Sequence, residues 1–250
     1  MRLNRAVVAS CLLLAAAPGA KAAPGLGEKV YDPYIRPGTL ELETRYGRLT
    51  GKSLDGESGA IVEAEYGFNE RFSGALVLEY EDHVGEKDKI DAVGVEGVLW
   101  LGQIPKLGID TSLYLEFEQR IHNESGVGEA KLLLGKQLGV WQVLVNLKAS
   151  RPFTSHADDR ITAFGYGVAI DREVTNFARV GVEAFGDLGD DHRFGGRQAH
   201  YIGPMVKWRV PFRKLKGELE IETSYLFAAG AARNDSRGQA RILLEWEKRF

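Results

Sequence analysis

The feature that most constrains this chain is an alternation of apolar and polar residues with a period of two, which runs from Thr39 to the C-terminus. In residues 218–225 every second position is glutamate or serine, and the positions between them are leucine, isoleucine, threonine and tyrosine. Successive side chains of a strand point to opposite faces, so each such segment has one apolar and one charged face. No stretch favours a helical period of 3.6 residues instead. The sequence therefore predicts an all-β fold.

The same alternation predicts about twelve strands, within a range of ten to fourteen. Turn residues recur between the segments, as a meander of antiparallel strands requires. Pro204 falls within the tenth strand, where it removes a ladder hydrogen bond, so we expect a bulge there or a strand that begins after it. The predicted strands lie near residues 39–47, 59–68, 71–81, 90–101, 107–121, 128–137, 140–150, 160–170, 177–187, 199–210, 217–228 and 239–250.

Strand length and connection length together favour a membrane barrel over a soluble one. The predicted strands have about ten to twelve residues, the length that a tilted strand needs to cross a bilayer, whereas strands of soluble proteins average roughly 5–6 residues. Long polar connections alternate with short ones, as in outer-membrane barrels with external loops and periplasmic turns. We therefore predict that residues 39–250 form a single antiparallel up-and-down transmembrane β-barrel with both termini on the periplasmic side.

Aromatic residues gather at the strand ends beside the short turns, where an interfacial girdle is expected. They are Phe68, Phe72, Trp100, Trp141, Phe177, Trp208 and Phe212.

Residues 1–22 have the features of a secretory signal peptide: a short basic region, an apolar run over residues 6–17, and a small-x-small cleavage site that ends at Ala22. The apolar run is shorter than the roughly 20 residues of a membrane-spanning helix. Cys11 is the only cysteine and lies in this segment, so the exported chain forms no disulfide.

Residues 23–38 contain three prolines and three glycines and have no alternation. We expect an irregular leader that stays on the periplasmic side as a tail. The segment, with Tyr31 and Tyr34, is also long enough to enter the lumen from below.

The last strand carries a resemblance to a known class of proteins. The chain ends in Phe250, and Ile242, Leu244 and Trp246 lie on one face of the strand before it. With its signal peptide and its meander of amphipathic strands, the chain resembles Gram-negative outer-membrane β-barrel proteins as a class. The resemblance implies export to the outer membrane, contact with its lipid, and recognition of the final strand by the barrel-assembly machinery. It singles out no functional family.

The charged faces of the strands should line the lumen of such a barrel. Acidic residues dominate the first three strands and basic ones appear later, which would set up a transverse field able to select solutes. Alternatively these groups pair and fill the interior, since twelve strands lie between filled eight-stranded barrels and open porins. The candidates are Glu41, Glu43, Arg45, Glu63, Glu65, Glu79, Glu81, Glu116, Glu118, Lys131, Lys148, Lys207, Arg209, Glu218, Glu220, Glu222, Arg241 and Glu245.

Other functions have weak support. The signal segment carries three of the 32 basic residues and none of the 35 acidic ones, so the exported chain is net negative, which disfavours nucleic acid. No cofactor fingerprint occurs. Acidic loop residues beside histidines lack the fixed spacing of a metal site, and we predict no metal and no catalytic residue. A lipid hydrolase would have to use loop groups, either Ser155, His156 and Asp158 or His122 with Ser125, which have no nucleophile-elbow motif.

We therefore expect a passive channel or facilitator for small polar solutes. The alternatives are a structural or surface-interaction barrel with a filled lumen and, less favoured, a lipid-acting hydrolase.

Overall fold

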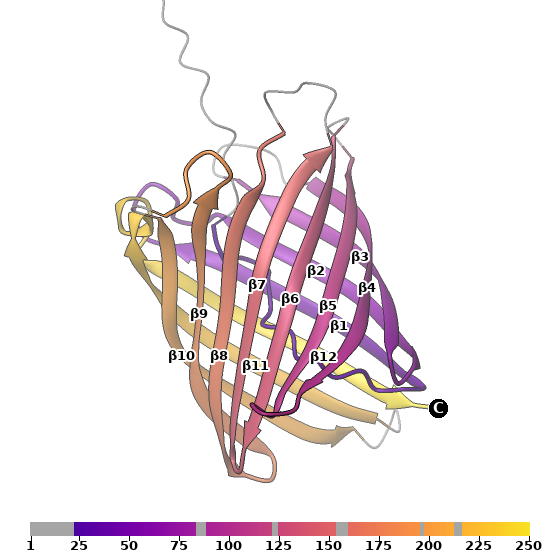
Figure 1. The fold of residues 1–250 in the computed structure, drawn as a ribbon. Helices are drawn as coiled ribbons and strands as arrows, with labels where there is room; N and C mark the ends of the chain where they lie inside the picture. Colours follow the sequence, from indigo (N-terminus) through magenta and orange to yellow (C-terminus); the bar gives the residue numbers. More distant parts are fainter. Residues whose placement is uncertain (1–22, 84–88, 122–124, 154–159, 196–197, 213–216) are drawn as a thin grey trace, which may run out of the picture.

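Twelve antiparallel strands close into one barrel, in which each strand pairs with its neighbours along the chain and β1 pairs with β12 (Figure 1). The computed structural model describes residues 23–83, 89–121, 125–153, 160–195, 198–212 and 217–250. A short 3₁₀ turn, η2 (Ala231–Asn234), precedes the last strand. The strands are β1 (Thr39–Thr50), β2 (Ser58–Asn69), β3 (Phe72–Asp82), β4 (Lys89–Ile104), β5 (Ile109–Arg120), β6 (Gly126–Leu138), β7 (Trp141–Phe153), β8 (Ala163–Thr175), β9 (Ala178–Asp190), β10 (Ala199–Phe212), β11 (Gly217–Gly230) and β12 (Gly238–Arg249).

The predicted fold class and strand number are confirmed, because each predicted segment overlaps one strand of the closed barrel. The largest shift is in β8, which begins at Ala163 rather than at 160 and ends at Thr175 rather than at 170. β8 extends beyond the apolar alternation of its sequence because its pairing with β9 continues to Thr175 and Ala178. Backbone hydrogen bonds form whatever the side chain, so polar residues can extend a strand beyond its apolar pattern.

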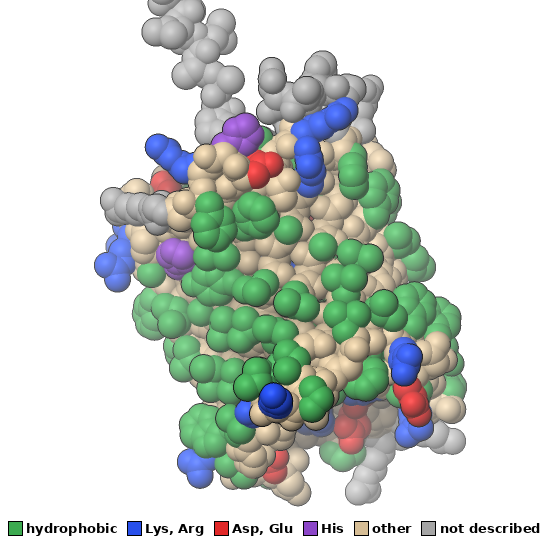
Figure 2. Space-filling view, in the orientation of Figure 1, with side chains coloured by type: hydrophobic (Ala, Val, Ile, Leu, Met, Phe, Trp, Pro, Cys, Tyr) green, Lys and Arg blue, Asp and Glu red, His purple; other side chains and the backbone are tan. Residues whose placement is uncertain are grey.

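Apolar side chains cover the outer surface in a broad belt, and charged side chains gather toward its two ends (Figure 2). On β3, Leu76 is 67% exposed, whereas Ala75 and Val77 on the opposite face are buried. On β1, Leu42 is exposed and Glu43 is buried. Apolar residues outside and ionisable residues inside are the arrangement of a barrel in lipid.

Exposed aromatic side chains ring the end of the barrel that holds Phe250 and the short turns. We call this the periplasmic end, and the opposite one the external end. Phe68 and Phe72 stack there with ring centroids 5.6 Å apart, and Trp141 and Phe177 are exposed beside the next turns. Among the described residues, no helix is long and apolar enough to cross a membrane.

Pro204 lies in the middle of β10 and neither ends the strand nor shifts its register. Pairing with β9 continues through Pro204 and Val182. On the β11 side the ladder skips two positions and resumes at Met205 and Ser224. Both alternatives expected from the sequence, a bulge or a later start, are therefore wrong. The missing donor is accommodated by a local gap in one ladder.

The last strand closes the barrel. Its pairing with β1 runs from Thr39 and Arg249 to Thr50 and Gly238. The residues that carry the resemblance to outer-membrane proteins lie on its outer side, where Ile242, Leu244 and Phe250 are exposed and Trp246 is half-buried.

Residues 23–38, the leader, lie inside the barrel and not outside it as a periplasmic tail (Figure 1). Tyr31 is 5% exposed and Pro33 is fully buried. The leader starts at the external end, where Ala23 packs near Leu49. It finishes at the periplasmic end, where the Gly38 amide donates to the Gly67 carbonyl at 2.7 Å. An irregular segment needs partners for its backbone groups, and the polar inner wall supplies them.

Candidate functional site

The lumen and the leader that crosses it form the candidate site. At the external end Leu26 packs with Leu49, Phe185 and Leu226 in an apolar cluster. The Gln239 side-chain amide donates to the Pro24 carbonyl at 2.9 Å. Apolar packing therefore holds the leader against the wall at this end of the lumen.

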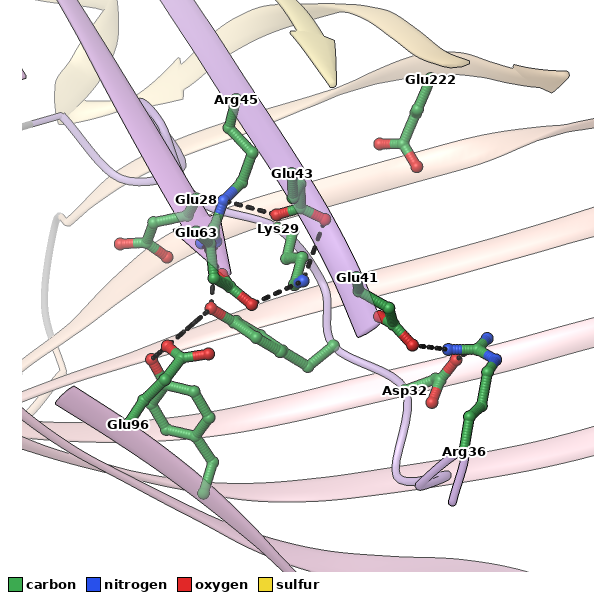
Figure 3. Close-up of polar contacts among 12 residues, drawn as sticks. Glu28, Lys29, Asp32, Arg36, Glu41, Glu43, Arg45, Glu63, Glu96 and Glu222 are labelled. Carbon is green, nitrogen blue, oxygen red and sulfur yellow. Dashed lines mark hydrogen bonds and ion pairs between the residues drawn. The ribbon is translucent and has the colours of Figure 1, made fainter. Parts of the chain in front are cut away.

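Ion pairs hold the middle of the leader against β1 and β2 (Figure 3). The Lys29 ammonium lies 2.9 Å from a Glu43 oxygen and 3.4 Å from a Glu63 oxygen. Arg45 pairs with the same two carboxylates and donates to the Tyr31 hydroxyl at 3.0 Å. Two cations thus share two nearly fully buried carboxylates, which locks the leader to this wall.

Tyr31 links the leader to the opposite wall as well. Its amide donates to Asn146 Oδ1 at 2.7 Å, and its carbonyl accepts from Asn146 Nδ2 at 2.9 Å. The Tyr31 ring packs 4.8 Å from the Tyr114 ring, and its hydroxyl lies 3.5 Å from a Glu96 oxygen. One leader residue therefore bridges β7, β4 and β5 across the lumen.

Glu28 meets the basic residues of the later strands. Lys148 pairs with Glu28 and also lies 3.6 Å from Glu129. Arg241 donates to the Glu28 carbonyl and pairs with Glu183 at 2.5 Å. The leader thus supplies a carboxylate to the basic side of the lumen and an ammonium to the acidic side.

Near the periplasmic end, the Ser112 hydroxyl donates to the Pro33 carbonyl at 2.6 Å. Arg36 lies 3.3 Å from Asp32 and 3.2 Å from Glu41. The Tyr34 hydroxyl donates to Asp110 at 3.1 Å. Partial burial and the contact with Asp110 raise the pKa of Tyr34 to about 12, so this hydroxyl keeps its proton.

A cavity of about 240 Å³ remains between the leader and the wall in the periplasmic half of the lumen. Charged side chains of both signs reach it. Its lining includes Lys29, Arg36, Glu65, Lys207, Glu222 and Glu245.

The lumen candidates named from the sequence lie on the inward-facing positions of their strands. Arg209 and Glu218 are exposed at the periplasmic mouth. The structure brings Arg45 together with Glu43 and Glu63. The others are distributed along the wall, with Glu41, Glu65, Glu220, Glu222, Lys207 and Glu245 around the cavity, Glu79, Glu81, Glu116 and Glu118 on β3 and β5, and Lys131, Lys148 and Arg241 on β6, β7 and β12.

The basic residues do not form a free basic arc. Lys207 pairs with Glu222 at 2.9 Å, and Arg209 pairs with Glu220 at 2.7 Å. Lys131 pairs with Glu129 at 2.8 Å. The transverse field expected from the sequence is therefore weakened on the basic side, because carboxylates neutralise it locally.

Several residues of the site were absent from the sequence-derived set. Glu96, Asn146 and Glu183 face the lumen and are buried. Alternation alone could have found them, since each occupies the inward parity of its strand. Lys29 and Arg36 of the leader had no such signal, because their partners lie on distant strands and their segment has no period.

The candidates for hydrolysis lie mostly outside the described residues: His122, Ser155, His156 and Asp158. At the described part of the external end, His83 lies 3.0 Å from Glu81. The backbone amide of His192 donates to Asp190 at 3.0 Å.

No protein-family model matches the chain, and no curated protein matches it by sequence. Solved structures share its fold. An outer membrane channel from Pseudomonas putida F1 superimposes with a TM-score of 0.58 at 12% identity, covering 92% of this chain and 100% of that one. The KdgM porin, solved in complex with disordered oligogalacturonate, has a TM-score of 0.52 at 11% identity, covering 84% of this chain and 99% of that one.

The NanC porin has a TM-score of 0.50 at 8% identity, and the match covers 84% of this chain and 99% of the porin. The chain therefore has the fold of small outer-membrane barrels, as the resemblance of its last strand implied.

Proposed function

We propose that this chain is an outer-membrane channel through which small polar solutes diffuse, and that its leader narrows the path. The observation that carries the proposal is the cavity of about 240 Å³ that stays open beside the leader. Eight-stranded barrels are filled by their own side chains, and a twelve-stranded wall encloses more room. Charged and polar groups line this space, as in pores that discriminate solutes by charge.

The lumen candidates have a defined role in this proposal. Glu41, Glu65 and Glu245 line the periplasmic half of the path from β1, β2 and β12, and Lys207 and Arg209 line it from β10. We also propose that residues 1–22 are removed on export, so that Ala23 begins the mature chain at the external end. N-terminal sequencing of the protein from outer membranes tests this cleavage.

A second candidate is a structural barrel with a filled lumen. The observation that favours it is the middle of the leader, where Tyr31 reaches Arg45, Tyr114 and Asn146 and bridges the lumen. The two candidates differ in one respect: a channel needs a path beside the leader or a leader that can move, whereas a filled barrel needs neither.

Recording from the refolded protein in planar bilayers tests the proposal. The wild type should show discrete conductance with brief larger openings as the leader shifts. A disulfide can hold the leader in place, since a Cβ on Gly47 would lie 3.5 Å from Leu26 Cα, which suits a bridge between cysteines at both positions. The chain has no other cysteine after the signal segment.

The oxidised Leu26→Cys/Gly47→Cys variant should lose the larger openings, and reduction should restore them. Leu26→Cys alone is the matched control and should respond to neither treatment. A complete absence of discrete conductance in the wild type and in the reduced variant, across salts and voltages, would contradict the channel and support the filled barrel.

A further inference from the structure

The register of the barrel sets glutamates directly opposite one another on neighbouring strands. Like charges in opposed positions destabilise a sheet, so this arrangement has a cost that a purely structural wall would avoid. The opposed pairs of one line are Glu218 with Glu247, Glu247 with Glu41, Glu41 with Glu65, Glu96 with Glu116, and Glu116 with Glu129. Those of the line beside it are Glu220 with Glu245, Glu245 with Glu43, and Glu43 with Glu63.

These glutamates form two adjacent lines, together called the acidic row below, and the longer line climbs the wall from the periplasmic to the external end. The longer line begins with Glu218 near the periplasmic start of β11 and ends with Glu129 near the external start of β6. It crosses β3 at Ala75, whose neighbours are Glu65 on one side and Glu96 on the other. A solute that follows this wall meets carboxylates over the whole height of the barrel.

The negative charge along this half of the wall exceeds the positive charge placed against it. The lysines and arginines that face the described lumen each pair with a carboxylate, among them Glu43, Glu63, Glu129 and Glu220 of the row. None of these cations lies within ion-pair distance of Glu65 or Glu245 in the periplasmic half, or of Glu79 or Glu118 in the external half. Among the charged groups that face the described lumen, those without an ion-pair partner are therefore carboxyl groups.

Buried polar atoms beside the row also lack partners. Ser73 is 1% exposed and Glu96 is 7% exposed, and among the described residues neither the Ser73 hydroxyl nor Glu96 Oε1 has a partner in hydrogen-bond geometry. Ser73 and Glu65 line the same cavity. Carboxylate oxygens of Glu63, Glu65 and Glu96 lie within 4.8 Å of one another. Glu63 is paired with Lys29 and Arg45, whereas no described cation lies within ion-pair distance of Glu65 or Glu96, and carboxylates that converge in this way favour a positively charged ligand.

The contacts of the Tyr114 hydroxyl indicate the same excess of acidic over basic groups. This hydroxyl lies 2.5 Å from a Glu96 oxygen and 2.6 Å from a Glu116 oxygen. A phenol has one proton to donate, so it can satisfy only one of these carboxylates. The Tyr31 hydroxyl, 3.5 Å from the same Glu96 oxygen, is a more distant second donor, and a proton or a cation would neutralise the charge that remains.

The leader shows which kind of group the row accepts. The Lys29 ammonium lies between Glu43 and Glu63 and 4.6 Å from the centre of the Tyr31 ring. Two carboxylates and an aromatic face make a favourable environment for an ammonium group. A solute with the same chemistry can use the row in the same way.

We propose that the lumen is selective for cations, and that the solutes it passes are monovalent metal ions and small organic molecules bearing an ammonium group. This inference rests on the proposed channel function and names its solute class. The carboxylates of the same row repel anions, including acidic sugars. Fields of this kind raise the local concentration of the favoured ion by about tenfold or more.

The test is the reversal potential of the refolded protein in a planar bilayer under a KCl gradient. The wild type should pass K⁺ in preference to Cl⁻ by about tenfold. Glu65→Gln and Glu245→Gln each replace a carboxyl group that has no ion-pair partner among the described residues, and each should lower this ratio. Glu70→Gln, in an exposed turn outside the lumen, is the matched control and should leave the ratio unchanged.

The outcomes separate the two proposals. Conductance with no preference or with preference for Cl⁻ would overturn cation selectivity and leave the channel standing. A ratio that falls equally in all three variants would also overturn it, since the row would then have no special role. Absence of conductance would remove the channel and this inference together. Flux of tetramethylammonium against acetate in vesicles repeats the test for any variant that folds too poorly for bilayer recording.

Discussion

The contact between Asn146 and the leader gives the sharpest test of how firmly the lumen is occupied. The Asn146 side chain accepts from the Tyr31 amide at 2.7 Å and donates to the Tyr31 carbonyl at 2.9 Å. It is 3% exposed. Asn146→Ala removes both hydrogen bonds and leaves two backbone groups of the seated leader without partners.

The size of the effect follows from these two bonds. Each lost bond costs about 1 kcal/mol where water can replace the amide and about 2 kcal/mol where the group stays dry. The seated leader is therefore destabilised by about 2–4 kcal/mol against the released one. Since 1.4 kcal/mol is about a factor of ten in an equilibrium constant, the released population should rise by roughly 30-fold to 700-fold.

Trypsin measures this population in protein refolded into lipid vesicles. Cleavage after Lys29 requires the leader to leave its site, because the Lys29 side chain is 14% exposed and ion-paired when seated. When opening and closing are fast, the cleavage rate follows the released population. Mass spectrometry of the 23–29 fragment separates this cut from cuts in the loops.

Asn69→Ala is the matched control, because Asn69 accepts from the Arg71 amide in a turn at the barrel rim and does not touch the leader. Its release rate should equal that of the wild type. If Asn146→Ala and Asn69→Ala release the fragment at the same rate, the two hydrogen bonds do not hold the leader and the reasoning fails.

Three further substitutions test other parts of the structure. Leu76→Lys places a charge in the middle of the outer belt and should lower the free energy of unfolding in vesicles by about 2–4 kcal/mol, measured by urea titration; no change would argue against lipid contact. Gly135→Ala places a Cβ 2.6 Å from Pro33 Cδ and should speed trypsin release of the leader. Phe250→Ser should lower the yield of assembled barrel in cells while changing the stability of the refolded barrel by less than about 1 kcal/mol; equal yields would contradict the proposed assembly role.

The barrel could be predicted from the sequence because its determinants are local. A lipid-facing strand needs an apolar residue at every second position, and alternate residues such as Leu113 and Leu115 satisfy this requirement. Loop lengths and terminal aromatics then set the orientation. Pro204 shows the limit of this reasoning, because the loss of one donor was tolerated by a gap in a single ladder.

The leader could not be predicted in the same way. Its place depends on partners more than a hundred residues away, such as Asn146 for Tyr31 and Lys148 for Glu28. Prolines and glycines remove any period that would point to these partners. The sequence of a polar segment with no period is equally compatible with a solvated tail and with a segment bound inside a polar lumen. The inner wall that binds it forms only when the barrel closes.

The leader and the acidic row are coupled through charge. Lys29 is the cation that the leader places between Glu43 and Glu63, and Arg36 is the one it places against Glu41. Release of the leader withdraws both cations from the acidic side together with the carboxylates of Glu28 and Asp32. The net side-chain charge of the lumen is therefore unchanged, but the acidic row is less neutralised. Along a path that follows this row, opening and cation preference should rise together. Asn146→Ala, which favours release without changing any charge, should increase the ratio of K⁺ to Cl⁻ permeability as well as the frequency of large openings. If large openings become frequent but the ratio falls, the acidic row does not govern the open path, and the pairing of Lys29 with Glu43 and Glu63 serves only to seat the leader.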